Sequence, residues 1–465
     1  MSTVVRISPS RLGDIVGAEN FSADPAQLAS YEVDSVQPSA VARPGSPGEV
    51  AELVRLAAAE KLAIIPAGAR TKLSIGMPPS RYDLAIDMTR LNRITAYDPG
   101  DLTLGVEPGC KLADLQKTLE QHNQVLPLAV PFTYQTTVGG AISSGVDSPL
   151  RQFYGTARDY VLGMEFVTGE GAQTKSGGRV VKNVTGYDLH KLMIGALGTL
   201  GIITRVNFKT FPLPRRSRGF LAFFSGHDGA LDLRRRIEQS PLTPLTLEIL
   251  SPEVAQIFAQ RSPSTAPGPP APGTWFETSH WVLAAAYEGN DQVLDRYTTD
   301  LARMAAEARA TSSIALDDTD RPKVWWRLRE FLSLMLDSSP AATIVKFSAL
   351  PGHFPALLEQ TGRIVERYEL PAATLLRGAG VAYLALLPRS RDEQTLHRLA
   401  LACAEIFQAS PAAEYRAMIP WCPAELKRTL NIWGPPREDF KLMQKLKAVF
   451  DPQGIFSPGR FMGGL

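Results

Sequence analysis

Cysteine and histidine are scarce in this chain of 465 residues, which has three cysteines and six histidines. Cys110, Cys403 and Cys422 lie far apart, and no Cys-x-x-Cys pair occurs. Iron–sulfur clusters and structural zinc sites need several closely spaced thiolate or imidazole ligands, so the sequence argues against both and predicts no metal site. So few cysteines are typical of a protein from a reducing compartment.

Long apolar runs are also absent. The longest unbroken apolar stretches, such as residues 381–387, are far too short to span a bilayer. The first residues carry no long apolar segment behind them, which argues against a secretory signal. We therefore expect a cytoplasmic protein whose association with a membrane is at most peripheral and is made through partner subunits.

Neither sign of charge dominates the chain. It has 49 lysines and arginines against 47 aspartates and glutamates, a formal net charge of +2. That balance gives no reason to expect nucleic acid or an anionic membrane as a main partner. The length allows two or three domains and a large buried core.

Helices and short apolar strands alternate between residues 37 and 215. A capping box at Ser46 to Glu49, with Pro47 at the first helical position, predicts the start of a helix. The apolar run Leu62–Pro66 predicts a short buried strand after it. Further strands are expected at residues 84–87 and 102–106, and a further helix at residues 111–122.

The second half of the chain predicts a different arrangement. Its strands are separated by helices with spacing compatible with an antiparallel sheet, which indicates an α+β cap domain. Strands are expected at residues 219–224, 280–286, 343–348 and 381–386, and helices at residues 228–239, 290–310, 392–408 and 438–450. We divide the chain into an N-terminal helical segment (1–36), a first domain (37–215), a cap domain (216–420) and a C-terminal segment (421–465).

Three glycine-rich stretches stand out in the first half. Pro66–Lys72 follows a strand, and Gly68 leaves backbone N–H groups accessible to a phosphate while Arg70 adds positive charge. Thr136–Gly145 combines glycines with hydroxyl groups, and a third stretch runs from residue 182 to residue 203. Each stretch taken alone is also compatible with an ordinary turn or with close packing of a helix on a sheet.

Several common ligand-binding motifs are missing from these stretches. None is the Gly-x-Gly-x-x-Gly fingerprint of a Rossmann domain, a Walker loop or a Gly-x-Ser-x-Gly elbow. The sequence therefore argues against binding of a nicotinamide dinucleotide and against nucleotide hydrolysis.

Taken together and in this order, the stretches resemble the FAD-binding domain of the vanillyl-alcohol oxidase superfamily, also called PCMH-type. Within it, the chain is most similar to FAD-linked 2-hydroxy-acid dehydrogenases, particularly the FAD-binding subunits of glycolate oxidase. The resemblance is carried by Pro66–Gly76, Thr137–Gly140, Tyr154–Gly155, Thr185–Asp188, Gly198–Gly201, Phe450–Gly454 and Ser457–Arg460. It implies an α+β fold, with an FAD-binding domain of two α/β subdomains and an α+β cap carrying an antiparallel sheet.

The resemblance also implies a cofactor site. The first two glycine-rich stretches would hold the pyrophosphate of FAD, residues 201–203 would lie beside the adenine or ribose, and Arg460 would return near the flavin. The implied cofactor-binding residues are Pro66, Ala67, Gly68, Ala69, Arg70, Thr71, Thr136, Thr137, Gly139, Gly140, Ser143, Ser144, Gly145, Tyr154, Gly155, Asp159, Gly201, Ile202 and Ile203. Some relatives tether FAD through a histidine in the first stretch. Here that stretch has neither histidine nor cysteine, so non-covalent FAD is expected.

The resemblance implies oxidation of a small 2-hydroxy acid such as glycolate or D-lactate, with an iron–sulfur protein and a second flavoprotein subunit as partners. In such relatives a base takes the hydroxyl proton and an arginine or lysine holds the carboxylate. Metal-dependent relatives carry two histidines seven positions apart followed by a glutamate, a pattern that this chain lacks. Two functions stay open: an enzyme that oxidises the acid, or a flavin-carrying structural or electron-relay subunit.

Four residues are candidates for catalysis. They are Tyr187, Arg327, Arg416 and Arg460, with Trp421, Lys427 and Trp433 as further polar candidates for the flavin face. Arg327 belongs to the stretch Lys323–Arg329, which is equally typical of an amphipathic helix with its tryptophans in the core.

Overall fold

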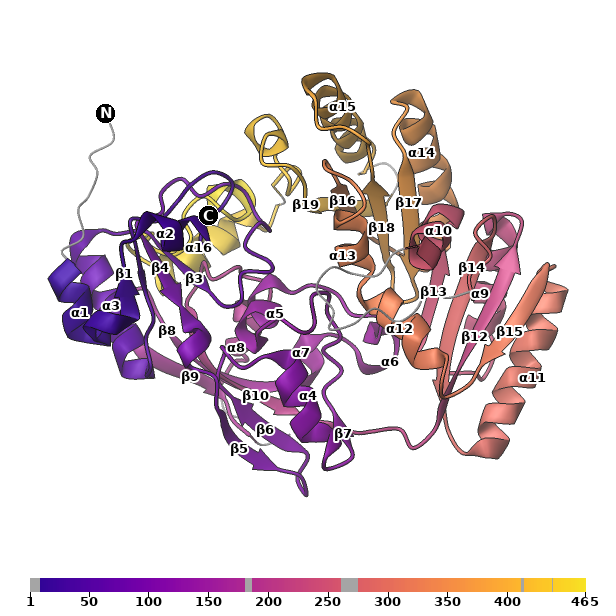
Figure 1. The fold of residues 1–465 in the computed structure, drawn as a ribbon, viewed down its shortest axis with the longest axis horizontal. Helices are drawn as coiled ribbons and strands as arrows, with labels where there is room; N and C mark the ends of the chain where they lie inside the picture. The colour runs from indigo at the N-terminus through magenta and orange to yellow at the C-terminus, as the bar shows by residue number, and fades with distance from the viewer. Residues whose placement is uncertain (1–8, 180–185, 261–274, 411–413, 437) are drawn as a thin grey trace.

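The computed structural model describes residues 9–179, 186–260, 275–410, 414–436 and 438–465. Thr185, which belongs to one of the motifs above, and residues 1–8 of the N-terminal segment lie outside the described residues. Two halves lie side by side, one built mainly from the first part of the chain and the other from the strands and helices that follow residue 215 (Figure 1).

The first half contains two sheets, as expected for two α/β subdomains. One sheet has the order β1 (Phe21–Ser22), β2 (Ala40–Ala42), β4 (Leu84–Asp87), β3 (Ile64–Ala67), with β2, β4 and β3 parallel. Helix α3 (Pro47–Glu60) crosses between β2 and β3 and packs its apolar face on this sheet. Its cap is the predicted one, because Ser46 Oγ accepts a hydrogen bond of 3.2 Å from the Glu49 N–H.

The second sheet of this half is antiparallel. Its order is β5 (Ile94–Asp98), β6 (Thr103–Val106), β10 (Ile202–Lys209), β8 (Val161–Val167), β9 (Gln173–Gly177). Helix α4 (Leu112–Glu120), near the predicted position, and helix α5 (Val138–Ser144) share an apolar core with it. The smaller elements are α1 (Pro9–Val16), η1 (Ala18–Asn20), α2 (Pro25–Ala29), η2 (Met88–Arg90), β7 (Gln124–Val125), α6 (Arg151–Tyr154), α7 (Ala157–Tyr160), α8 (His190–Met193) and β11 (Phe211–Pro212).

The second half contains the antiparallel sheet that the sequence predicts. Its order is β15 (Ser312–Leu316), β12 (Ser217–Phe224), β14 (Trp281–Glu288), β13 (Thr246–Leu250), β17 (Ala372–Arg377), β18 (Val381–Leu386), β16 (Thr343–Ala349), β19 (Tyr415–Trp421). Every pairing in it is antiparallel. The four strands expected from sequence are present, and β13, β15, β17 and β19 are additional.

Both faces of this sheet are covered by helices. Strand residues alternate between the faces, so that Phe220 and Phe224 meet one set of helices and Leu221 and Phe223 meet the other. The first face is covered by α9 (His227–Glu238), α11 (Asp291–Glu307), α14 (Phe354–Arg367) and α15 (Glu393–Ala409). The second is covered by α10 (Pro252–Gln260), α12 (Arg321–Arg329) and α13 (Phe331–Leu336). The remaining short helices are η3 (Pro351–His353), η4 (Leu426–Arg428) and η5 (Met462–Gly464).

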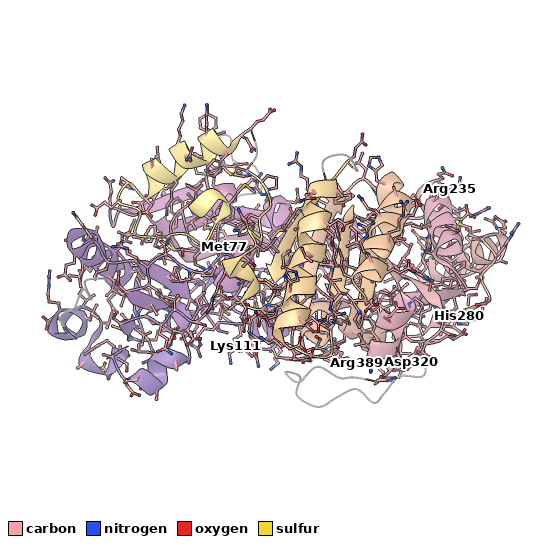
Figure 2. The ribbon with its side chains drawn as sticks, turned by 90° about the horizontal axis from the view of Figure 1, so that it is seen from above. Met77, Lys111, Arg235, His280, Asp320 and Arg389 are labelled. Atoms are coloured by element: carbon pink, nitrogen blue, oxygen red, sulfur yellow. The ribbon has the colours of Figure 1, made fainter. Side chains whose placement is uncertain are left out.

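The two halves are joined by an apolar core on the second face of the sheet. Ile75 of the first half is part of the same cluster as Phe331 and Trp421, and Phe132 and Leu197 pack against it. Lys111 and Arg235, which Figure 2 labels, lie in the separate halves on either side of this junction. Burial of apolar surface of this kind is the main force that holds packed domains together.

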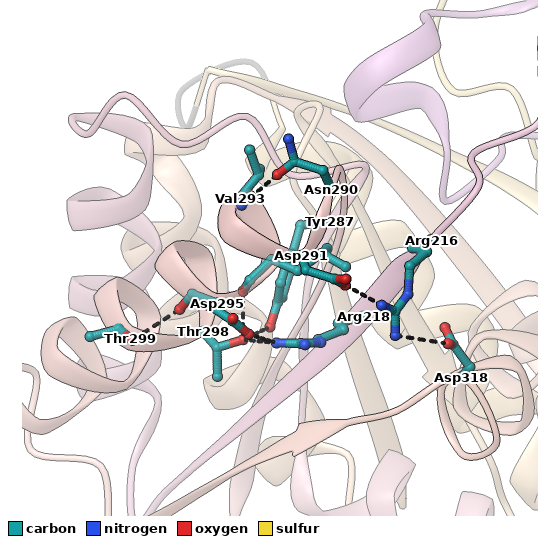
Figure 3. Close-up of polar contacts among 11 residues, drawn as sticks. Arg216, Arg218, Tyr287, Asn290, Asp291, Val293, Asp295, Thr298, Thr299 and Asp318 are labelled. Carbon is teal, nitrogen blue, oxygen red and sulfur yellow. Dashed lines mark hydrogen bonds and ion pairs between the residues drawn. The ribbon is translucent and has the colours of Figure 1, made fainter.

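The chain enters the second half along a charged surface. Arg218 at the start of β12 donates a hydrogen bond of 2.7 Å to Asp295 of α11, and Arg216 pairs with Asp291 and Asp318 (Figure 3). These side chains are largely exposed, so each pair contributes little to stability.

The end of the chain returns to the first half. Helix α16 (Phe440–Phe450) packs on the second sheet of the first half, where Phe450 shares an apolar core with Phe166 of β8. The Ile64 N–H donates to Ile455 O at 2.7 Å, and the Ser457 N–H donates to Ile64 O at 2.8 Å, so the tail pairs with β3. We propose that residues 37–215, 216–420 and 421–465, after the segment 1–36, act as the functional divisions of the chain.

No helix in the described ranges combines the length and the apolar character that crossing a membrane requires.

A buried ion pair ties the C-terminal segment to two parts of the first half. Lys427 has no exposed side-chain surface, and its Nζ lies 2.8 Å from Asp34 Oδ2, whose side chain is also buried. The same Nζ donates to Ser74 O at 2.6 Å. One cation therefore holds the N-terminal segment, the first glycine-rich loop and the C-terminal segment in contact.

We expect Lys427→Met to lower the free energy of unfolding by about 3–5 kcal/mol, because it leaves the Asp34 carboxylate buried without its partner. The double variant Asp34→Asn, Lys427→Met should recover part of that loss, since no unpaired charge remains. Urea unfolding of the two variants and the parent measures both effects. A loss below about 1 kcal/mol for Lys427→Met would show that the pair does not hold these segments.

Candidate cofactor-binding cleft

A cleft lies among three segments of the first half and the end of the chain. It encloses about 750 Å³ between protein atoms, part of it open to solvent, which is in the range of small-molecule sites. Its walls come from the loop after β3, from the start of α5 and from the turn before β10, and Arg460 contributes from the C-terminal segment.

The first loop can approach the second only because it contains glycine. A Cβ on Gly68 would lie 2.2 Å from Thr137 Oγ1, far inside contact distance. Two residues further on, Arg70 has a φ of +64°, and its guanidinium lies over the Tyr31 ring at 4.6 Å. Arg70 Nη1 is also 3.6 Å from Asp87 Oδ2 at the end of β4. These contacts place a positive charge on one wall of the cleft.

The second loop leads directly into α5. Thr137 caps this helix, and its Oγ1 accepts a hydrogen bond of 3.3 Å from the Gly140 N–H. Gly139 packs against the preceding segment, where a Cβ would come within 2.7 Å of Pro108 Cβ. Ser143 and Ser144 donate to the carbonyls of Gly139 and Gly140 at 2.6 and 2.7 Å, which leaves their oxygens as acceptors along the cleft.

Lys72 joins the two loops. Its buried Nζ donates to Thr136 Oγ1 at 2.6 Å, to Pro131 O at 3.1 Å and to Thr71 Oγ1 at 3.2 Å. Burial lowers the pKa of this lysine from 10.5 to about 7, because the charged form is poorly solvated there. The residue thus fixes the spacing of the two loops and lines the cleft as well.

Arg460 lines the cleft from the C-terminal segment. Its side chain is buried, and Nη2 donates to the carbonyls of Leu73 and Ile75. Its Nε is buried with no hydrogen-bond partner in the described part of the chain. Burial lowers the pKa of the guanidinium to about 10, so it stays charged at neutral pH. A buried charged donor without a partner is costly, and an acceptor on a bound ligand would satisfy it.

These features fit FAD. Two loops approach closely at glycines whose side chains would fill the gap, so backbone groups can reach a pyrophosphate. Arg70 and Arg460 add positive charge along the same cleft, and the unpartnered Nε–H of Arg460 would be a donor for a carbonyl or nitrogen acceptor of a flavin ring.

Most of the residues implied for the cofactor come together in this cleft. Those that line it are Pro66, Ala67, Gly68, Ala69, Arg70, Thr71, Thr137, Gly139, Gly140, Ser143, Ser144, Gly201, Ile202 and Ile203. Lys72, Leu73, Ile75, Met88, Pro108, Leu197 and Gly198 also line it and were not in the implied set. Lys72 could have been added from its place in the first loop, whereas an apolar residue such as Met88 gives no sequence signal.

Five implied cofactor residues support the cleft without lining it. Thr136 is buried and accepts the hydrogen bond from Lys72, and Gly145 ends α5 with a φ of +60°. Tyr154 packs edge-on against Phe211. Gly155 has a φ of +78°, and Asp159 Oδ2 accepts from the Thr156 N–H at 2.7 Å at the start of α7. Thr136 thus precedes α5, whereas Gly145, Tyr154, Gly155 and Asp159 belong to the segments that follow it.

Three of the four candidate catalytic residues are not among those that line the cleft. Tyr187 is 90% exposed, and Arg416 is exposed on β19. Arg327 is fully buried in the second half, where Nε donates to Phe258 O at 2.8 Å and Nη1 donates to Lys323 O at 3.3 Å. Nε and Nη1 of Arg327 thus bind main-chain carbonyls away from the cleft, and its contact with a substrate carboxylate stays a prediction. Arg460 alone of the four reaches the cleft.

The three further polar candidates for the flavin face lie in three different parts of the structure. Lys427 belongs to the buried ion pair with Asp34, and Trp433 Nε1 donates to Arg460 O at 3.1 Å. Trp421 lies at the end of β19 in the core between the two halves.

Comparison with known protein families shows which family this chain belongs to. Residues 38–177 match the family described as FAD binding domain, and residues 213–409 and 435–461 match the C-terminal domain of FAD linked oxidases. The chain belongs to the FAD-linked oxidase family of the vanillyl-alcohol oxidase superfamily. Its cofactor is FAD, and the cleft described above lies largely within the part that matches the FAD binding domain.

Two curated proteins are similar to this chain over most of their length. Glycolate oxidase subunit GlcD of Bacillus subtilis (strain 168) is 25% identical over 461 residues, covering 97% of this chain and 95% of that protein. Glycolate oxidase subunit GlcE of Escherichia coli (strain K12) is 28% identical over 418 residues, covering 89% of this chain and 97% of that protein. Among solved structures, p-cresol methylhydroxylase with substrate bound superposes with a TM-score of 0.77 at 18% identity, covering 97% of this chain and 95% of that chain. That likeness shows the fold.

We expect Gly68→Ala to weaken FAD binding by about tenfold or more, about 1.4 kcal/mol, because the added methyl group forces the first loop away from Thr137. Titration of the apoprotein with FAD, followed by flavin fluorescence, measures the change. Gly362→Ala is the matched control, since a Cβ there, within α14, meets nothing within 4 Å. Equal FAD affinity for the two variants would contradict the role of the first loop.

The buried amine of Lys72 predicts a pH-dependent stability. Its pKa of about 7 in the folded protein lies below the 10.5 of an ordinary lysine, so the unfolded chain binds more protons between these values. The free energy of unfolding should therefore rise with pH above 7, by up to about 1.4 kcal/mol per pH unit from this group. Between pH 7 and pH 9, the free energy of unfolding measured with urea should rise more steeply for the parent than for Lys72→Met. Equal slopes of this free energy against pH for the two proteins would contradict a buried, poorly solvated amine at Lys72.

Proposed function

We propose that this chain is the FAD-carrying subunit of an oxidoreductase that oxidises the CH–OH group of a small 2-hydroxy acid, such as glycolate or D-lactate, and passes the electrons to a separate protein. The observation that carries the proposal is the cleft in which two glycine-containing loops face each other beside the buried Arg460, next to a complete cap sheet.

The names of the relatives support the substrate class. Besides the two glycolate oxidase subunits, D-lactate dehydrogenase of Anaerostipes hadrus is 28% identical over 351 residues, covering 73% of this chain and 70% of that protein. All three names refer to small acids that carry a hydroxyl group on the carbon next to the carboxylate.

In this proposal the chain positions the cofactor by backbone groups. FAD, when bound, supplies a two-electron acceptor for the carbon-bound hydrogen of the substrate. The first and second loops would hold its pyrophosphate, and Lys72 keeps them at a fixed spacing through Thr136 and Pro131. Arg460 would donate its free Nε–H to an acceptor of the ring system. The first loop has no histidine or cysteine, so the cofactor would be dissociable.

The electron acceptor would be another protein. The described residues contain no group of three or more histidine, cysteine, aspartate or glutamate side chains placed to hold a metal ion. We propose a second flavoprotein subunit as a partner, because two relatives are each named as a subunit of a glycolate oxidase. We also propose an iron–sulfur protein as a partner, which is what the resemblance to the FAD-binding subunits of glycolate oxidase implies. The assembly would be cytoplasmic, with any contact to a membrane made through those partners.

A second function is favoured by the wall of the cleft that faces the cap. Ile75 and Leu197 line the cleft and also pack in the core that contains Tyr383 and Trp421. An apolar wall of this kind suits a flavin-carrying electron-relay subunit, which holds FAD for a catalytic partner without binding substrate itself.

One experiment separates the two functions. The purified chain is loaded with FAD, made anaerobic, and mixed with glycolate or D-lactate while its visible spectrum is recorded. Loss of the oxidised flavin band with the chain alone is the expected result for the enzyme. A band that is lost only after partner proteins are added supports the relay subunit. A protein that takes up no FAD would overturn both.

A further inference from the structure

Strand β15 forms an open edge of the cap sheet. It pairs with β12 on one side, and no strand in the described part of the chain pairs with its other side. Alternate residues of such a strand point their backbone N–H and C=O groups outwards, where water or another strand can bind them. Figure 1 shows β15 on the side of the cap that faces away from the first half. The open edge is therefore remote from the cofactor cleft.

Helices leave the centre of this strand uncovered on both faces. Ser313, Ile314 and Ala315 follow one another, and all three are exposed. Successive side chains of a strand point to opposite faces of the sheet, so exposure of three in a row means that neither face is covered there. Ile314 is 36% exposed, whereas Leu221, its partner in the ladder on β12, is fully buried. The centre of β15 thus lies outside the helical cover that protects the rest of the sheet.

The sequence of β15 does not protect this edge. Edge strands of soluble proteins are commonly blocked by a lysine, a proline or a β-bulge, each of which hinders pairing with another chain. The strand reads Ser-Ser-Ile-Ala-Leu, with no charge and no proline, and its pairing with β12 runs without a shift in register. An edge that lacks these devices is expected where another strand covers it.

The charges that flank β15 fit a second copy of the same strand. Arg309 precedes the strand, Asp317 and Asp318 follow it, and all three are exposed. When two copies pair in antiparallel fashion about Ile314, the start of one strand meets the end of the other. Arg309, five positions before Ile314, then approaches Asp318 of the second copy, four positions after it. Within its own chain Asp318 has only a long contact, of 3.9 Å, with Arg216.

We propose that β15 pairs with β15 of a second copy of this chain, so that the two cap sheets join into one antiparallel sheet across a twofold axis. Main-chain hydrogen bonds hold the two edges together, and the two Ile314 side chains meet at the axis. The contact between Arg309 and Asp318 occurs twice, because the interface is symmetric, and it fixes the direction of pairing. Each first half, with its cofactor cleft, lies at a far end of the dimer (Figure 1).

The test is the oligomeric state of FAD-loaded full-length protein, measured by analytical ultracentrifugation over a wide range of protein concentration at low salt. We expect the parent to form a dimer. Arg309→Glu and Asp318→Arg should each raise the dissociation constant of the dimer by about tenfold or more, because two attractive contacts become two repulsive ones. An equimolar mixture of the two variants should dimerise as the parent does, since every contact across the axis again joins opposite charges.

Two further variants complete the test. Arg389→Glu is the matched control, because it makes the same change of charge at an exposed position after β18, the sixth strand of the sheet counted from β15. It should dimerise as the parent does. Ile314→Lys sets two like charges against each other at the axis and should abolish the dimer. FAD affinity and the midpoint of thermal unfolding should stay those of the parent in all four variants.

The mixture gives the decisive outcome. Dimerisation that is lost in Arg309→Glu and in Asp318→Arg and returns when they are mixed supports the pairing, because a folding defect would not be repaired by mixing. A parent protein that stays monomeric at every concentration would overturn the proposal. A dimer that none of these variants weakens would also overturn it, since the interface would lie elsewhere. None of these measurements depends on whether a 2-hydroxy acid reduces the flavin.

Discussion

The close approach of two loops, linked by one buried lysine, is the constraint on which the cofactor cleft depends. Gly68 brings the first loop against Thr137, and Lys72 then spans from that loop to Thr136 and Pro131. Burying an amine costs free energy, and three acceptors within hydrogen-bond distance offset much of that cost. The result is a gap of defined width between two stretches of backbone, which is what recognition of a pyrophosphate needs.

The cap is part of this arrangement, because it holds the segment that leads into the second loop. Glu330, at the junction of α12 and α13, accepts hydrogen bonds from the N–H groups of Phe132 and Thr133 at 2.7 and 3.2 Å and from Thr133 Oγ1 at 2.9 Å. The same carboxylate is buried and accepts from Ser333 Oγ. A movement of the cap relative to the first half would therefore disturb the loop that carries Pro131 and Thr136. The cavity lined by Phe132, Arg391 and Trp421 lies beside this segment and shares Thr71 with the cofactor cleft.

Family and fold do not by themselves decide the reaction. The chain shares its architecture with p-cresol methylhydroxylase, although the two are only 18% identical, so the reacting groups must be argued from local residues. Here Ile75 and Leu197 give the cleft an apolar wall, whereas Arg391 lines a neighbouring cavity. An enzyme needs the cavity that contains Arg391 beside the reacting part of the flavin, whereas a relay subunit needs only the apolar wall there.

Local sequence patterns determined much of this protein. The order of the glycine-rich stretches predicted the family, which the family comparison confirms. The same stretches contain the loops that line the cleft. Short apolar runs indicated strands such as β12 and β18, and Ser46 indicated the start of α3. Tertiary structure alone decided the partners of buried polar side chains. Arg327 reads in sequence as a possible ligand-binding residue, yet it is enclosed by main-chain carbonyls, while Arg391 and Trp421, distant in sequence, meet in one cavity. The physical reason is that backbone conformation follows from neighbouring residues, whereas burial and charge pairing depend on segments that only folding brings together.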